Sequence, residues 1–186
     1  MIGGHKINII FVGPNPERFG KKSNPGGQLT AALGIKKFFS KMNVNFVIID
    51  TLQVSFPPSS IVTRLFAGFR RVIKLFLLLS FNNYSSVVLF SCAGLSFYER
   101  TLMCAISKMF NTRSILMNRD GHFKAMLDSS RLSALLVKIF LKFPTQIVVQ
   151  GESWKKLLIS HKIPESKVSV IKNWISPENM VATEPI

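Results

Sequence analysis

Acidic residues are scarce in this 186-residue sequence. Only 9 Asp plus Glu stand against 24 Lys plus Arg, which gives a formal net charge of +15 at pH 7. A surplus of this size favours anionic partners such as nucleic acid, acidic lipid or phosphorylated substrates. A hydrophobic content of 47% excludes a disordered chain, and the length suits a single domain around one core.

Cysteine is scarce too, with two residues in the sequence. Cys92 ends an apolar run and Cys104 lies inside a predicted helix, so we expect both to be small buried hydrophobic side chains. Their spacing fits no metal site, and we predict none. This usage of cysteine fits a reducing, cytoplasmic compartment.

Long apolar runs and a dinucleotide fingerprint are also lacking. No segment reaches about 18 uncharged apolar residues, which excludes an ordinary membrane span. The apolar run at 7–12 is too short for a signal peptide. Pro14 follows Gly13, so the pattern G-x-G-x-x-G is missing. We therefore predict no nicotinamide or flavin cofactor.

Short apolar runs alternate with helical patterns along the chain. Strands are predicted at residues 7–12, 44–51, 86–92, 112–117, 145–150 and 167–171. Helices are predicted at about 28–41, at 61–81, at 96–110, at 131–143 and after Ser153. This order predicts a doubly wound, mainly parallel α/β domain of Rossmann-like type over residues 1–178. Residues 179–186 are expected to be a frayed tail or the start of an interdomain linker.

A glycine-rich loop follows the first predicted strand. Gly26 and Gly27 stand just before the helix that starts near Gln28, where amide groups are exposed at the positive end of the helix dipole. A phosphate can bind at such a position, beyond the carboxyl end of a parallel strand. The alternative is a surface loop in which the glycines only make the turn.

Polar residues cluster after the fourth predicted strand, again where such sheets bind ligands. Arg119 offers a planar fork to a phosphate or carboxylate, and His122 can exchange a proton with a substrate hydroxyl. The alternative is a turn stabilised by Asp120 and Gly121. Three further polar residues are assigned structural roles: Glu99 in a capping box with Ser96, Ser153 as a helix cap, and Asp50 in a loop or cap.

The predicted helix at 61–81 is amphipathic. Its cations fall on one arc of the helical wheel: Arg64, Arg70, Arg71 and Lys74. Apolar side chains fall on the other: Ile61, Leu65, Phe69, Val72, Ile73 and Phe76. One interpretation is a surface helix that packs this apolar side on the sheet. The other is a helix that lies on an anionic bilayer, where the four cations bind acidic lipid or a lipid-linked acceptor.

The order of motifs resembles the N-terminal half of family-4 glycosyltransferases of the GT-B fold. The similarity rests on the strand ending VGPNP, the Gly-Gly loop, the polar DGH turn and the closing stretch IVVQGESWKKLLISHKIPESKVSVIKNWI. By this resemblance Gly26 and Gly27 approach the phosphate and sugar of the donor. His122 and its neighbour Asp120 correspond to the polar turn near the reacting sugar, and Asn173 to a hinge. The sequence departs from the family in having Trp174 where Gly is usual, and Arg-Asp-Gly-His where His-Gly or His-Asp is usual.

The resemblance implies the acceptor-binding half of an enzyme that transfers a sugar from a sugar nucleotide to a hydroxyl acceptor. Such enzymes make polysaccharide or glycolipid, here at the inner face of the cytoplasmic membrane. The nucleotide-binding domain and its E-x7-E pair are missing from the sequence, so the chain is expected to be inactive alone, whether it is truncated or one subunit of a split enzyme.

Two alternatives stay open. The first is a basic domain that binds nucleic acid or an acidic membrane without catalysis. Basic residues are not interleaved with exposed aromatic ones and no groove-reading motif is present, so nucleic acid is not the expected partner. The second is a non-catalytic remnant that only associates with another protein.

Overall fold

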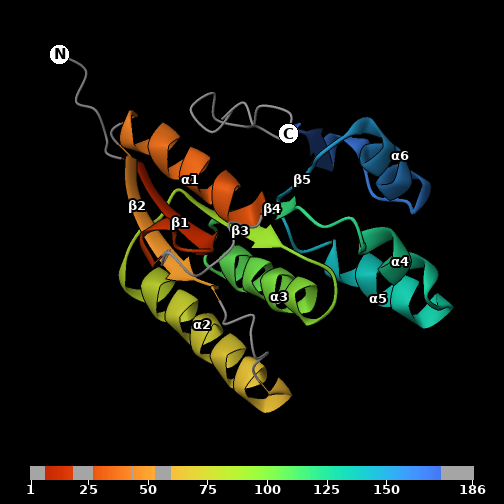
Figure 1. Cartoon of the computed structure of the whole chain (residues 1–186), viewed down its shortest axis with the longest axis horizontal. Helices are drawn as coiled ribbons and strands as arrows, with labels where there is room; N and C mark the ends of the chain where they lie inside the picture. Colours follow the sequence, from red (N-terminus) through yellow and green to blue (C-terminus); the bar gives the residue numbers. More distant parts are fainter. Residues whose placement is uncertain (1–6, 19–26, 43, 53–59, 173–186) are drawn as a thin grey trace, which may run out of the picture.

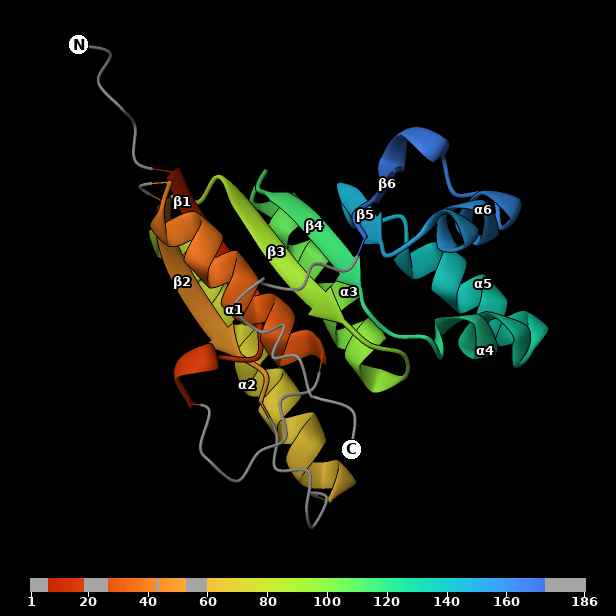
Figure 2. The same ribbon diagram turned by 45° about the horizontal axis from the view of Figure 1, so that its top comes forward.

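A computed structural model describes residues 7–18, 27–42, 44–52 and 60–172. Six parallel strands form one sheet in the order β2-β1-β3-β4-β5-β6 (Figure 2). The strands are β1 (Ile7–Gly13), β2 (Val44–Asp50), β3 (Ser86–Ser91), β4 (Arg113–Asn118), β5 (Gln146–Val149) and β6 (Val168–Val170). The predicted doubly wound α/β fold is confirmed.

Helices connect the strands and cover both faces of the sheet. They are α1 (Gly27–Ser40), α2 (Ile61–Phe81), α3 (Leu95–Met109), α4 (Phe123–Asp128), α5 (Arg131–Phe140) and α6 (Glu152–Ser160), with short 3-10 turns at Pro16–Arg18 and Glu165–Lys167. Figure 1 shows α1 on one side of the sheet and α2 and α3 on the other. Every predicted strand and helix is present, with ends that differ by a few residues.

Alternation along the strands builds one apolar layer on each face of the sheet. Ile10 and Val12 of β1 point into the layer under α2 to α6, while Ile9 and Phe11 point into the layer under α1. The Phe11 ring lies in van der Waals contact with two aromatic neighbours, with centroids 5.4 Å from Phe46 and 4.8 Å from Phe90. The strands are thus buried on both faces, as their continuous apolar runs predicted.

The helix caps differ from those predicted. Ser60 is the N-cap of α2, and its hydroxyl accepts a hydrogen bond from the backbone N–H of Thr63 at 3.2 Å. The predicted capping box is wrong, since α3 begins at Leu95 with Gly94 as its N-cap, and Glu99 forms ion pairs instead. The cap predicted at Ser153 is also wrong, because Gly151 is the N-cap of α6.

The predicted loop role of Asp50 is confirmed. Its Oδ1 accepts hydrogen bonds from the backbone N–H groups of Asn15 and Leu52, both at 2.9 Å, and its Oδ2 pairs with Arg18. The carboxylate therefore ties together the loops that follow β1 and β2.

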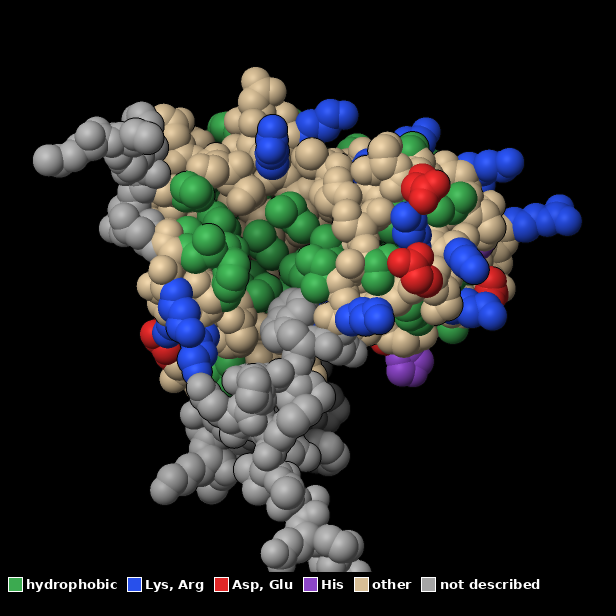
Figure 3. Space-filling model, turned by 90° about the horizontal axis from the view of Figure 1, so that it is seen from above, with side chains coloured by type: hydrophobic (Ala, Val, Ile, Leu, Met, Phe, Trp, Pro, Cys, Tyr) green, Lys and Arg blue, Asp and Glu red, His purple; other side chains and the backbone are tan. Residues whose placement is uncertain are grey.

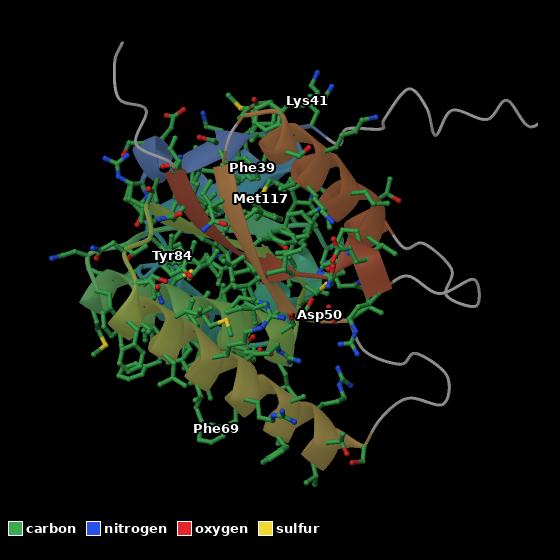
Figure 4. The ribbon with its side chains drawn as sticks, turned by 90° about the vertical axis from the view of Figure 1, so that its left-hand side faces the viewer. Phe39, Lys41, Asp50, Phe69, Tyr84 and Met117 are labelled. Atoms are coloured by element: carbon green, nitrogen blue, oxygen red, sulfur yellow. The ribbon has the colours of Figure 1, made fainter. Side chains whose placement is uncertain are left out.

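Helix α2 does not bury the side that its amphipathic pattern predicted. Its buried residues are Gly68, Leu75 and Leu79, whereas Phe69, which faces away from the sheet in Figure 4, is 62% exposed. The larger apolar side chains of α2 share that exposure: Ile61, Val62, Leu65, Phe66, Ile73, Phe76, Leu77 and Phe81. Small and aliphatic residues let α2 pack closely, which leaves the bulky side chains outside. We call this set, with Phe69, the apolar face of α2.

The opposite, α1 side of the molecule also shows hydrophobic side chains, with Lys and Arg toward the rim (Figure 3). Among the described residues, no helix is both long enough and apolar enough to cross a membrane.

Candidate functional site

The loops that follow β3 and β4 meet at the carboxyl edge of the sheet. Ser91 and Asn118 pair at the ends of these strands, and the backbone N–H of Arg119 donates to the carbonyl of Ser91 at 3.1 Å. One residue further on, Asp120 Oδ2 accepts a hydrogen bond from the backbone N–H of Ala93 at 2.7 Å. The predicted polar cluster is therefore held against the loop after β3, at the edge where ligands bind in such sheets.

Asp120 and His122 form a hydrogen-bonded pair. Asp120 Oδ1 lies 2.9 Å from both the backbone N and the ring Nδ1 of His122. The Asp120 side chain is 18% exposed and that of His122 is 88% exposed. A carboxylate on Nδ1 favours the tautomer in which Nδ1 carries the proton, so Nε2 is left to accept one. The pair has the composition of a general base and the group that orients it.

The environment of Asp120 keeps the carboxylate ionised. Partial burial by itself raises the pKa, but hydrogen bonds from the backbone of His122 and Ala93, followed by the His122 ring, outweigh it. The pKa of Asp120 therefore lies below its usual range, and the negative charge beside His122 persists at neutral pH.

Arg119 is half-buried next to this pair. Its guanidinium carbon lies 5.4 Å from the centroid of the Phe90 ring, which is a cation–π distance. Burial lowers the pKa of Arg119, although an arginine of this kind keeps its charge at neutral pH.

The start of α1 reaches the same edge of the sheet. Gln28 Nε2 lies 2.6 Å from Cys92 Sγ, directly after β3. Gly27 is the first residue of α1, is exposed, and has no other atom within 4 Å of where a Cβ would stand. Gly26, the hinge residue Asn173, Trp174 and the boundary predicted at residue 178 lie outside the described residues.

A cavity of about 580 Å³ opens from this edge and extends between α2 and α3. Gln28, Thr51 and Cys92 line its end at the sheet. Its walls are mostly apolar and include the following side chains: Leu65, Phe69, Val72, Phe90, Leu95, Tyr98, Leu102 and Phe140. We call it the α2–α3 cavity. Cys92 is therefore half-buried at a cavity wall and not a core residue as predicted, whereas Cys104 is buried as predicted.

Charged residues from both helices meet in this cavity. Glu99 Oε1 and Oε2 accept hydrogen bonds from Arg71 Nε at 2.7 Å and Nη2 at 3.0 Å. Arg100 Nη1 lies 2.5 Å from the same Oε1, and Arg100 Nε donates to the carbonyl of Phe90 at 3.2 Å. The exposed fractions of the three side chains are 11% for Arg71, 16% for Glu99 and 4% for Arg100. We call these residues the Arg–Glu–Arg cluster.

The cluster shifts the pKa of its carboxylate and of the buried arginine. Burial by itself raises the pKa of Glu99, but the hydrogen bonds from Arg71 and the charges of both arginines bring the net pKa below its usual range. Burial lowers the pKa of Arg100, and Glu99 opposes that shift. At neutral pH all three groups carry their charges.

The predicted residues thus fall into three groups. Gln28, Arg119, Asp120 and His122 lie on neighbouring elements at one edge of the sheet. Arg64 lines the α2–α3 cavity, and so does Arg71. Arg71 was predicted to bind a membrane or an acidic acceptor. Its side chain is turned inward and paired with Glu99, so it does not face a membrane surface, and its assignment to an acidic acceptor stays a prediction.

The remaining two cations of α2 stay outside. Arg70 and Lys74 are exposed, and Lys74 Nζ lies 3.5 Å from the carbonyl of Ile48. Arg100 was not predicted from the sequence, and Glu99 was predicted in another role. The two residues are an adjacent acidic and basic pair in α3, but their partner Arg71 lies 28 residues before Glu99 in the sequence.

Among the described residues, no group of three or more His, Cys, Asp or Glu side chains could hold a metal ion.

Comparisons with known proteins show the fold. No protein-family model matches the sequence, and no curated protein matches it. The chain is similar to HepE from Anabaena, solved in complex with UDP, at 12% identity and a TM-score of 0.50 over 92% of this chain and 47% of that one. HepE in complex with UDP and glucose aligns at 10% identity, with a TM-score of 0.48, over 92% and 48% of the two chains. The chain spans about half the length of these structures.

Proposed function

We propose that this chain is the acceptor-binding half of a sugar-nucleotide-dependent glycosyltransferase. The observation that carries the proposal is the Asp120–His122 pair, fixed at the carboxyl edge of the sheet beside the start of α1 and the mouth of the α2–α3 cavity. A base at that edge can meet a hydroxyl group, and the cavity can hold the rest of the acceptor.

The chemistry assigned to the pair is proton removal. During transfer the acceptor oxygen bonds to the anomeric carbon of the donor sugar while the bond from that carbon to the diphosphate breaks. The hydroxyl proton passes to Nε2 of His122, and Asp120 stabilises the imidazolium that forms. The diphosphate leaves with its electron pair, and Arg119, Gly27 and Gln28 are the residues of this chain that we assign to its negative charge.

The donor is inferred to be a nucleoside-diphosphate sugar. HepE was solved with UDP, and its similarity to this chain extends over about half of its own length. We assign the nucleotide mainly to the half of such an enzyme that this chain does not span, whether as another domain or as a separate subunit. The family-4 resemblance of the motifs supports the same arrangement.

We further propose that the protein works on an acidic membrane surface, at the inner face of the cytoplasmic membrane, in the synthesis of polysaccharide or glycolipid. Support comes from the apolar face of α2, which is exposed next to Arg70 and Lys74. A helix with exposed Phe and Leu beside cations binds an anionic bilayer through apolar burial and charge attraction.

A variant comparison tests the catalytic assignment. Membranes from cells that lack the gene are supplied with labelled UDP-sugars and with purified protein, and label is followed into the lipid extract. Where wild-type protein restores incorporation, we expect His122→Ala and Asp120→Asn to restore it at a rate lower by about 10²-fold or more. His161→Ala, which changes the histidine at the C-cap of α6, is the matched control. Equal rates for His122→Ala and wild type would overturn the assignment.

A further inference from the structure

The arginines that line the α2–α3 cavity outnumber its acidic residues. Among the described residues that line it, Arg64, Arg71 and Arg100 face a single carboxylate, Glu99. Arg71 and Arg100 are almost fully buried and share that carboxylate. A buried charge without its own counter-ion is costly, so the cluster is one anion short.

We propose that the α2–α3 cavity binds an anionic amphiphile, namely a hydrocarbon chain joined to a phosphate. The phosphate pairs with the arginines of the Arg–Glu–Arg cluster and with Arg64 at the mouth. A phosphate that links the chain to the rest of the acceptor carries a negative charge, which supplies the anion that the cluster lacks, and guanidinium groups bind phosphate through paired hydrogen bonds.

The apolar walls of the cavity can bind the hydrocarbon chain of such a ligand. Most of the lining is apolar and two of its side chains, Leu65 and Phe69, also belong to the apolar face of α2. They are 55% and 62% exposed, so apolar surface continues from the interior of the cavity to the outside of the helix. A chain that leaves the cavity along this path enters a bilayer on which α2 lies. Inorganic phosphate alone would leave this apolar wall unused.

Gly68 makes the room for such a ligand on the α2 side. It is a buried helical glycine, and a Cβ built on it would stand 3.4 Å from Cδ and Oε2 of Glu99. One methyl group fits at that distance, whereas a longer side chain would fill the space in front of the cluster. Gly68→Leu therefore blocks the cavity without removing a charge.

The inference rests on the proposed function in one respect, since the amphiphile is taken to be the lipid end of the acceptor. The binding itself needs neither donor nor transfer. Loss of sugar transfer with binding intact would count against the proposed function alone, and absence of binding with transfer intact would count against this inference alone.

The test is the binding of dodecyl phosphate to the full chain, by calorimetry below the critical micelle concentration. Dodecyl glucoside supplies the same chain with an uncharged head, and inorganic phosphate supplies the head alone. We expect dodecyl phosphate to bind at one site and at least 10-fold more tightly than either control. Equal affinity for dodecyl glucoside would overturn the proposal.

Variants locate the site. We expect Gly68→Leu and Arg71→Met each to weaken dodecyl phosphate binding by at least 10-fold, while Arg70→Met, which removes an exposed charge next to Arg71, leaves it within 2-fold. Wild-type affinity in Gly68→Leu, or an equal loss in Arg70→Met, would show binding to the helix surface and overturn the proposal.

Labelling of Cys92 gives a second readout that needs no substitution and does not depend on the folding of Arg71→Met. Cys92 lines the cavity and Cys104 does not. We expect dodecyl phosphate to slow the reaction of Cys92 with a small uncharged maleimide by at least 5-fold, with no effect from dodecyl glucoside at the same concentration. An unchanged labelling rate would overturn the proposal.

Discussion

Glu99 is the residue whose surroundings differ most from what the sequence suggests. It lies between two guanidinium groups instead of capping a helix, and these contacts hold its pKa below the usual range. A carboxylate with a depressed folded-state pKa stabilises the fold above its unfolded pKa. That contribution is lost as pH falls through the lower, folded-state value.

Glu99→Gln is therefore expected to destabilise the protein in a pH-dependent way. At pH 7 the substitution leaves Arg71 and Arg100 without their carboxylate and lowers the free energy of unfolding by about 2–3 kcal/mol. As the pH falls below the usual pKa of a glutamate, about 4.3, the stabilisation that the Glu99 carboxylate gives to the wild-type protein is progressively lost, so the difference at pH 3 should be smaller. Urea unfolding at both pH values measures it. A difference that is the same at pH 7 and pH 3 would contradict the ion-pair account.

Glu165→Gln is the matched control. Glu165 pairs with Lys155 at 2.8 Å on the surface, where its side chain is 69% exposed. Solvent screens such a pair, so we expect no measurable change in stability at either pH.

Gly13 is a second residue with a specific role in packing. A Cβ at this position would overlap the ring of Phe11, which is fully buried and held between Phe46 and Phe90. We expect Gly13→Ala to lower the free energy of unfolding by about 1–3 kcal/mol, because the ring has nowhere to move.

Gly27→Ala is the control for this substitution, since no other atom lies within 4 Å of the added methyl group. We expect a change within about 0.5 kcal/mol. Equal losses in the two variants, measured by chemical denaturation, would show that the contact with Phe11 is not the cause.

Among the helices and strands, α2 has the bounds that the sequence predicted but not the predicted orientation. Its bounds, residues 61–81, agree with the prediction. Its orientation does not. A helical wheel places Arg71 with the other cations, but Glu99 neutralises Arg71 from 28 residues away and lets it turn inward. No local pattern encodes such a partner, so neither the inward turn of Arg71 nor the cavity behind it could be predicted.

The strands were predictable for a physical reason. Each strand is a short apolar run that is buried on both faces of a parallel sheet. Such a strand can be recognised from its apolar residues alone, without knowledge of its neighbours. The polar cluster could be placed at the carboxyl edge because parallel strands end together there. The hydrogen bond between Ala93 and Asp120, which fixes the cluster, joins two loops that are 27 residues apart. No pattern in the sequence of either loop predicts it.

The exposed orientation of α2 leads to a prediction about membranes. We expect the protein to bind vesicles that contain acidic phospholipid, and the double variant Arg70→Glu with Lys74→Glu to bind at least 10-fold more weakly, since each cation near an anionic surface contributes about 1 kcal/mol. Cosedimentation measures this.

The control for this double variant is Lys155→Glu with Lys156→Glu, which removes the same charge from α6. Equal loss in both double variants would contradict a specific role for α2 and would indicate general charge attraction. Binding that survives acidic lipid and is competed by DNA would instead favour a nucleic-acid partner.

At the scale of the whole molecule, the features of the site lie close together. The Asp120–His122 pair, the start of α1 and the mouth of the α2–α3 cavity share the carboxyl edge of one sheet, and the cavity continues into the apolar face of α2. In the proposed enzyme a lipid-borne acceptor enters from the membrane along α2 and presents its hydroxyl at His122. In the same proposal the nucleotide of the donor is assigned to the half that this chain does not span.

The proposed division of donor and acceptor sites is tested by the transfer of labelled sugar from UDP-sugars into lipid. Transfer is measured with the purified chain alone and with membranes of cells that lack the gene, with and without the chain added. We expect no transfer by the chain alone, little by the membranes alone, and restored transfer when the two are combined. Transfer by the purified chain alone, or equal transfer by membranes with and without it, would show that the proposed division is wrong.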